Sequence, residues 1–192
     1  MSDTPMPPPD PRQDRILAAA RDHFAHHGFD RTKLADIAKA AEVAVGTVYL
    51  RYAGKTELLV AVLQQTEQAF VERLTNPALQ DIGWSNRFDV VFAEMFDQAQ
   101  ADPLLPSLMA LTPFAMAGGW HPGAAVRNAI AAHLAQGQAS GDVRRDLDTA
   151  IAAAMAHGMV EGAMALLFAQ PYMDRSTVIA HLAAASRKWL LR

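Results

Sequence analysis

The stretch of the chain that most constrains its fold runs over residues 32–55, TKLADIAKAAEVAVGTVYLRYAGK. Apolar residues recur in its first half every three or four positions, which places one apolar stripe along a single face of a short helix. These residues are Leu34, Ile37, Ala38 and Ala41. After a break at residues 42–43, residues 45–52 can form about two helical turns, with Val48 and Tyr52 directed inward. The sequence therefore predicts a helix-turn-helix, with Thr32 as the expected N-cap of its first helix.

The rest of the chain also favours helices. A hydrophobic fraction of 51% in 192 residues fits a well-packed protein, and strand signals are scarce beside Ala-rich segments with helical periodicity. We therefore expect an all-α fold of about nine helices. The first should begin after Asp10 as its N-cap and end at Gly28. The later helices are expected from Lys55 to before Pro77, from Trp84 onward, and over 104–119, 122–139, 147–170 and 174–191, with kinks at Pro106 and Pro113 in the 104–119 helix.

Composition also limits the setting in which the chain works. There is no Cys, so neither a disulfide framework nor a thiolate metal site is available. No uninterrupted apolar run approaches the roughly 20 residues that span a bilayer, and the Pro-rich N-terminus is unlike a signal peptide. We therefore expect a cytoplasmic protein with no membrane partner, whose residues 1–10 form a disordered tail.

A longer ordered pattern surrounds the helix-turn-helix, from about residue 15 to residue 63. It comprises an Ile-Leu-Ala-Ala opening, a Phe four residues before a Gly-aromatic turn, Asp-Ile-Ala in the second helix, Gly-Thr-x-Tyr in the third and Lys-x-Glu-Leu opening the fourth. In this pattern the chain resembles the tetracycline-repressor (TetR) family of transcriptional regulators. Two positions depart from it, because Glu42 stands where the turn usually has Gly and Ala44 where the recognition helix usually has a capping Ser. Each departure is expected to weaken the local structure by about 1 kcal/mol.

The resemblance implies a three-helix DNA-binding domain over residues 11–57 and a regulatory domain over residues 58–192, which binds a ligand and dimerises. The net charge of −3 does not exclude DNA binding, because residues 12–58 hold eight basic and six acidic residues. Val45 replaces a frequent Lys and can meet a thymine methyl, and Lys55 can form a phosphate site at the N-terminus of the fourth helix. The expected DNA-binding residues are Thr32, Lys33, Val45, Gly46, Thr47, Tyr49, Leu50, Arg51 and Lys55.

Two groups of residues in the C-terminal part are candidates for the ligand cavity and the dimer interface. Aromatic and Met residues at helical spacing can line an apolar cavity, although such residues more often form plain core. The cavity candidates are Phe88, Phe92, Met95, Phe96, Met109, Phe114, Met116, Trp120, Met155 and Met159. Two Gly on one face of the 147–170 helix suggest that another backbone passes close by. The interface candidates are Ala154, Gly158, Glu161, Gly162, Ala165, Leu166, Val178, Leu182 and Trp189.

Several histidines are candidates for a metal site or for a polar pair within the protein. His23, His26 and His27 have metal-ligand spacing, but without an acidic cluster nearby an exposed polar face is favoured, so no metal or cofactor is expected. His157 and Glu161 are four residues apart, and a hydrogen-bonded pair is favoured over contact with a ligand or a dimer partner.

Other classes of protein are less well supported by the sequence. There is no HExxH, GxSxG or phosphate-binding Gly loop, so no enzyme is expected. A helical adaptor would share the dimer helices without needing the DNA-binding residues. The sequence therefore favours a homodimeric repressor, released from a palindromic DNA operator by a small apolar or amphipathic ligand.

Overall fold

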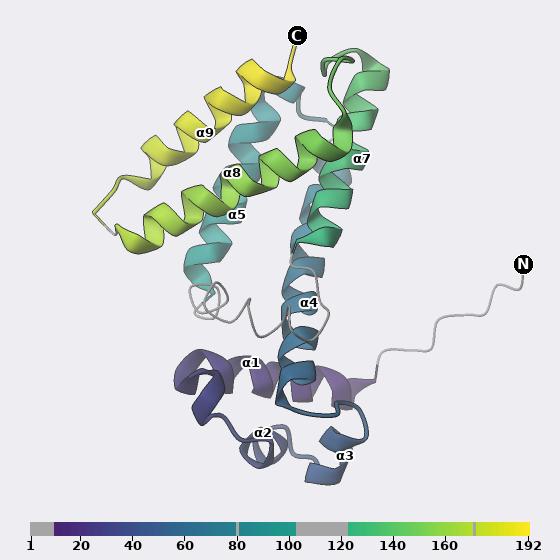
Figure 1. Cartoon of the computed structure of the whole chain (residues 1–192), viewed down its shortest axis with the longest axis vertical. Helices are drawn as coiled ribbons and strands as arrows, with labels where there is room; N and C mark the ends of the chain where they lie inside the picture. Colours follow the sequence, from purple (N-terminus) through teal and green to yellow (C-terminus); the bar gives the residue numbers. More distant parts are fainter. Residues whose placement is uncertain (1–9, 80, 103–122, 171) are drawn as a thin grey trace, which may run out of the picture. The chain divides into compact units, whose positions relative to one another are not determined.

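The computed structural model describes residues 10–79, 81–102, 123–170 and 172–192. Within these ranges every regular element is a helix and no strand occurs, which confirms the all-α prediction (Figure 1). The elements are α1 (Pro11–Arg31), α2 (Leu34–Ala40), α3 (Val45–Tyr49), α4 (Lys55–Leu74), the short 3₁₀ helix η1 (Pro77–Leu79), α5 (Trp84–Ala101), α7 (Ala124–Ser140), α8 (Thr149–Ala169) and α9 (Arg175–Leu190). The helix expected over residues 104–119 lies outside the described residues.

The chain divides into two compact units, with the boundary inside α4 between Gln64 and Gln65. In the first unit, α1, α2, α3 and the first part of α4 supply the buried apolar side chains. The largest fully buried ones are Ile16, Phe24, Ile37, Val48, Leu58, Leu59 and Val62. Val48 and Tyr52 are both buried, as their four-residue spacing predicts.

α1 begins as the sequence predicts. The Asp10 carboxylate accepts a hydrogen bond from the backbone N–H of Arg12 at 2.9 Å, and Pro11 occupies the first helical position. The helix breaks at Gly28, where the sequence predicts its end. Gly28 has φ 74°, and after this break one more turn continues to Arg31, with the Phe24 and Phe29 rings 5.8 Å apart.

Thr32 does not cap α2, which corrects the sequence prediction. Its hydroxyl donates instead to the backbone carbonyls of Gly28 at 2.7 Å and His23 at 3.1 Å, so it satisfies acceptors near the end of α1. Lys33 occupies the N-cap position of α2 without a side-chain hydrogen bond. Thr32 is buried as a result.

The turn between α2 and α3 is strained, as expected from the residue that occupies it. Glu42 has φ 55°, and it is the non-Gly residue with positive φ in the described part of the chain. Ala44 occupies the N-cap position of α3 without a side-chain hydrogen bond, and the helix runs from Val45 to Tyr49, so it is shorter than the predicted 45–52 helix. The recognition helix is thus held by its neighbours more than by its own ends.

We expect Glu42→Gly to stabilise the protein by about 1 kcal/mol, because Gly adopts this left-handed conformation without a Cβ clash. The ion pair that is lost, between Glu42 and Arg15 at 4.0 Å, is exposed and contributes little. Urea unfolding followed by circular dichroism measures the gain. Glu42→Ala keeps the Cβ and removes the ion pair, so an equal gain in that variant would show that the backbone conformation is not the cause.

The second unit packs α5, α8 and α9 around one core cluster, and α7 joins a smaller cluster beside it. The first cluster comprises Phe92, Met95, Phe96, Val160, Ile179, Leu182 and Ala183. The second comprises Leu134, Val143, Ala152 and Leu190. Gly137 on α7 is required there, since a Cβ would collide with the side chains of Val143 and Trp84.

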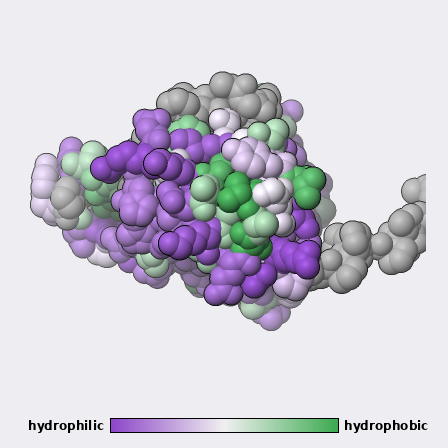
Figure 2. Space-filling model, turned by 90° about the horizontal axis from the view of Figure 1, so that it is seen from below, coloured by the Kyte–Doolittle hydropathy of each residue, from purple (hydrophilic) through white to green (hydrophobic). Residues whose placement is uncertain are grey.

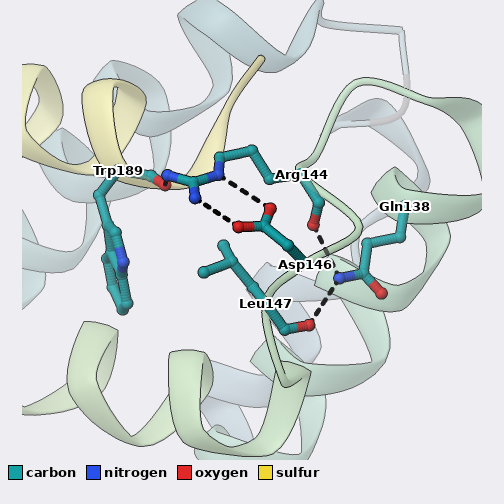
Figure 3. A network of polar contacts seen from close by, with 5 residues as sticks. All are labelled: Gln138, Arg144, Asp146, Leu147 and Trp189. Carbon is teal, nitrogen blue, oxygen red and sulfur yellow. Dashed lines mark hydrogen bonds and ion pairs between the residues drawn. The ribbon is translucent and has the colours of Figure 1, made fainter.

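The polar loop between α7 and α8 is tied to the end of α9 (Figure 3). Gln138 donates to the carbonyls of Arg144 at 2.8 Å and Leu147 at 2.9 Å, and Arg144 forms a two-pronged ion pair with Asp146. Arg144 also donates to the carbonyl of Trp189 at 3.5 Å. These bonds fix the ends of α8 and α9 so that the two helices lie side by side (Figure 1).

α8 is long and apolar enough, by length and composition, to cross a membrane, although only 17% of its most apolar window is buried. The sequence prediction did not identify this helix as a candidate membrane span, because His157 and Glu161 interrupt its apolar run. Much of this apolar helix therefore faces outward in the single chain.

Candidate DNA-binding surface and ligand cavity

α3 presents large apolar side chains to the outside. The exposed fractions are 39% for Val45, 55% for Tyr49 and 88% for Leu50. Figure 2 shows the face that carries α3, where a compact apolar area lies within a mostly hydrophilic surface. A five-residue helix gains nothing in stability from these exposed groups, so this face is available for contact with another molecule.

Gly46 lies on the same face. It is exposed, its φ is not in the left-handed region, and a Cβ at this position would meet no atom within 4 Å. A Gly inside a helix costs about 1 kcal/mol relative to Ala. The fold therefore does not require Gly at this position. A Gly here would instead allow another molecule to approach the backbone of α3 closely. The neighbouring Thr47 is half-buried and Lys33 is exposed.

Two of the predicted phosphate-binding cations have partners within the protein. The Lys55 ammonium donates to the carbonyls of Asp30 at 3.1 Å and Thr32 at 3.2 Å, and lies 4.5 Å from the centre of the Phe29 ring. In this structure Lys55 therefore holds the end of α1 against the start of α4, and its contact with a DNA phosphate stays a prediction. Arg51 forms an ion pair with Asp10 at the start of α1.

The first unit also contains an open basic groove that the sequence reasoning missed. It is about 650 Å³ in volume and lies between the second half of α1 and α2. Its lining comprises His23, His27, Arg31, Thr32, Lys33, Asp36, Lys39 and Ala40. The signal was present in the sequence, since His23, His27 and Arg31 recur every four residues along one face of a helix.

The second unit encloses a mostly apolar cavity of about 80 Å³. Its lining comes from α4, α5, α7, α8 and α9, namely Leu74, Trp84, Arg87, Phe88, Val91, Phe92, Met95, Ile130, His133, Leu134, Ala156, His157, Val160, Ser186 and Leu190. Small-molecule sites usually measure about 300–1,000 Å³, so a ligand must displace side chains to enter.

The cavity contains some of the predicted lining residues and excludes others. Phe88, Phe92 and Met95 line it. Phe96 is buried in the core cluster instead, and Met159 packs against that cluster. Met155 is 55% exposed on the outer side of α8, so its assignment to the cavity was wrong. The remaining candidates, Met109, Phe114, Met116 and Trp120, lie outside the described residues.

The lining of the cavity also includes a buried arginine and histidine, which the sequence reasoning did not detect. Arg87 is 8% exposed, donates to the carbonyl of Ile82 at 2.8 Å, lies 4.5 Å from the Trp84 ring and contacts Nε2 of His133 at 3.0 Å. Because Arg has only donors, Nε2 of His133 accepts this bond and the imidazole is neutral. Burial and the positive charge of Arg87 lower the pKa of His133.

The protein should lose stability as the pH falls below about 6.5, the ordinary pKa of His. The pKa of His133 is lowered in the folded state, so the unfolded chain takes up a proton more readily, and the stabilisation present above the unfolded pKa is lost on acidification. Denaturant unfolding at several pH values tests this. His133→Gln should flatten the dependence, although His157, whose pKa burial also lowers, should leave part of it. An unchanged slope in His133→Gln would contradict the assignment.

His157 belongs to a second polar group at the cavity. Its Nδ1 lies 3.6 Å from Glu161, which is too far for the predicted hydrogen bond, and His157 also lines the cavity. A Cβ on Gly123, which has φ 72°, would collide with the imidazole. Glu67 on α4 accepts hydrogen bonds from the N–H groups of Ala125 at 2.9 Å and Val126 at 3.4 Å, which caps α7.

The outer face of α8 forms one exposed stripe of apolar and small residues. It includes Ile151, Ala154, Met155, Gly158, Gly162 and Leu166, and Glu161 and the half-buried Ala165 lie beside it. A Cβ on Gly158 or Gly162 would meet no atom within 4 Å. Of the predicted interface residues on α9, Val178 and Trp189 are half-buried. Leu182 is 8% exposed and belongs to the core cluster of the second unit, so it does not lie on this surface.

Comparison with known proteins agrees with this geometry. Residues 16–62 match the bacterial regulatory proteins of the tetR family. The fatty acid metabolism regulator protein of Bacillus subtilis is 26% identical over 92 residues, which cover 48% of this chain and 47% of that protein. The chain thus spans about half the length of this curated relative.

Solved structures match over nearly the whole chain. The fatty acid degradation regulator FadR from Bacillus halodurans superposes with a TM-score of 0.75 at 24% identity, covering 92% of this chain and 95% of that one. The transcriptional regulator FadR from Bacillus subtilis in complex with stearoyl-CoA has a TM-score of 0.68 at 20% identity, covering 89% and 97%.

The fold and the exposed third helix define a helix-turn-helix DNA-binding protein. Residues 16–62 carry the DNA-binding domain of the tetR family of bacterial regulatory proteins. The relatives that it matches are regulators and not enzymes.

Proposed function

We propose that the protein is a homodimeric repressor, released from a palindromic operator by a small apolar or amphipathic ligand. The exposed face of α3 carries this proposal, because Val45, Gly46, Tyr49 and Leu50 have no role in the fold that explains their exposure. In DNA, apolar side chains can meet thymine methyl groups, and Gly46 lets the backbone approach the base edges.

The exposed stripe on α8 supports dimerisation. An apolar helix face with two glycines fits a second helix that packs closely against it, and Ala180 and Ala184 on α9 are also exposed small residues. A two-fold dimer presents two copies of α3, which engage successive major grooves when their centres are about 34–36 Å apart.

The cavity in the second unit supports ligand control. A ligand that fits only an expanded cavity binds one conformation better than another, and it shifts the population by no more than that difference in affinity. The relative from Bacillus subtilis was solved with stearoyl-CoA, which is an amphipathic molecule of the class we propose here. Because its partner is DNA, we expect the protein in the cytoplasm.

Selection from randomised duplexes, followed by sequencing and titration with the full chain, tests the proposal. We expect a palindromic sequence to be enriched and the complex to contain two protein chains per duplex by analytical ultracentrifugation. Failure to enrich any sequence would favour a helical adaptor. Enrichment of a single half-site by a monomer would remove the dimer from the proposal.

A further inference from the structure

We propose that the cavity takes an anionic amphiphile, a molecule with an apolar body and an acid head group, and that the hydroxyl of Ser186 donates a hydrogen bond to that head group. This inference deepens the ligand control proposed above and rests on it. It names a chemical class for the ligand and a residue that selects it.

Ser186 is the first support. It is 1% exposed in the middle of α9, lines the cavity, and its Oγ has no hydrogen-bond partner. A helical Ser usually bonds to the carbonyl four residues earlier, and buried hydroxyls are nearly always paired. An unpaired hydroxyl at a cavity wall is costly in the ligand-free protein, and a ligand acceptor atom removes that cost.

The charge of the wall is the second support. Arg87 in the lining carries a positive charge, which interacts with Asp142 outside the lining, and no Asp or Glu is among the described residues that line the cavity. His133 and His157 are kept neutral by burial, since it lowers the pKa of each. A cationic ligand would be repelled by Arg87 in this low-dielectric setting, whereas an acid group is attracted.

The remaining wall suits the apolar body. Phe88, Phe92 and Met95 from α5 line the cavity together with Ile130 of α7 and Val160 of α8. Met95 has an unbranched and flexible side chain that can move aside for a ligand. The polar groups and this apolar wall together provide the two environments that an amphiphile requires.

Calorimetric titration of the full chain without DNA, using four ligands with the same twelve-carbon chain below their micelle concentrations, tests the inference. The probes are dodecanoate, dodecyl phosphate, dodecanol and dodecylammonium. We expect at least one acid to bind about tenfold or more tightly than dodecanol, and dodecylammonium to bind most weakly. Comparing the two acids distinguishes a carboxylate from a phosphate head group.

Ser186→Ala tests the residue itself. We expect it to reduce the preference for the acid over dodecanol by about tenfold, while it raises the melting temperature of the ligand-free protein because an unpaired buried hydroxyl is removed. Ser85→Ala, at an exposed position of α5 outside the cavity, is the matched control and should change neither value.

Equal affinity for all four probes, a preference for dodecylammonium, or no binding of any probe would overturn the inference. An unchanged preference in Ser186→Ala would remove Ser186 from it. Titration of the same preparation with operator DNA separates these outcomes from failure of the proposed function, because DNA binding does not require the acid ligand.

Discussion

Gly46→Glu is expected to abolish operator binding, with a loss of affinity of about 100-fold or more, while the protein stays folded. The new side chain meets no atom of the protein, and Glu is both a better helix former than Gly and favourable in the first turn of a helix. On DNA, the same carboxylate would stand among phosphates and base acceptors where the backbone of α3 must approach closely.

Electrophoretic mobility shift with the selected operator measures the loss, and thermal unfolding measures stability. Gln64→Glu adds the same charge at an exposed position of α4 and should leave the specific affinity nearly unchanged. Gly46→Ala should stabilise the protein and weaken binding only modestly. If Gly46→Glu binds the operator as well as the wild type does, α3 is not the element that reads DNA.

Gly162→Arg is expected to convert the protein into a monomer and to weaken operator binding by about 100-fold or more. In the single chain the new side chain has open space, and replacing a Gly within α8 favours the helix by about 1 kcal/mol. Across a two-fold axis, however, two charged side chains would stand where the α8 stripes meet. A monomer contacts only one half-site of the operator. It therefore loses the increase in affinity from linked binding, which is commonly a factor of about 10²–10⁴.

Sedimentation equilibrium gives the association state, and mobility shift gives the affinity. Gln65→Arg places the same charge on exposed α4 and should remain dimeric. Gly162→Ala should remain dimeric as well, with at most a small loss. A dimer that persists in Gly162→Arg would place the interface elsewhere on the chain.

Local pattern was sufficient for the helices and for the strained turn. Apolar spacing placed Val48 and Tyr52 inward, and Glu42 was expected to be strained because a Gly usually stands at that turn. Phe88, Phe92 and Met95, which the sequence proposes for a ligand cavity, line the apolar cavity of the second unit, and their contact with a ligand stays a prediction. Each of these expectations depends on residues a few positions apart, where helical geometry alone decides which side chains are neighbours.

Side chains that depend on distant backbone groups were not predicted. Lys55 turns inward because the end of α1 brings the carbonyls of Asp30 and Thr32 within its reach, and nothing near Lys55 in the sequence indicates this. Met155 and Met159 were both assigned to the cavity because α8 is apolar on nearly all sides, so no polar face marks its outer surface. The roles of Arg87, His133 and Ser186 likewise arise only when α5, α7 and α9 are brought together.

Gly46 and Gly162 both lie in helices where a larger side chain would have open space around it. This matters for directed evolution of the protein toward higher thermal stability. At both positions a residue with a higher helix propensity than Gly should stabilise the single folded chain by about 1 kcal/mol, because a Cβ there meets no atom within 4 Å. Selection for thermal stability alone would therefore favour substitutions at these two sites. The large ones, such as Gly46→Glu, would give folded proteins that no longer bind their operator.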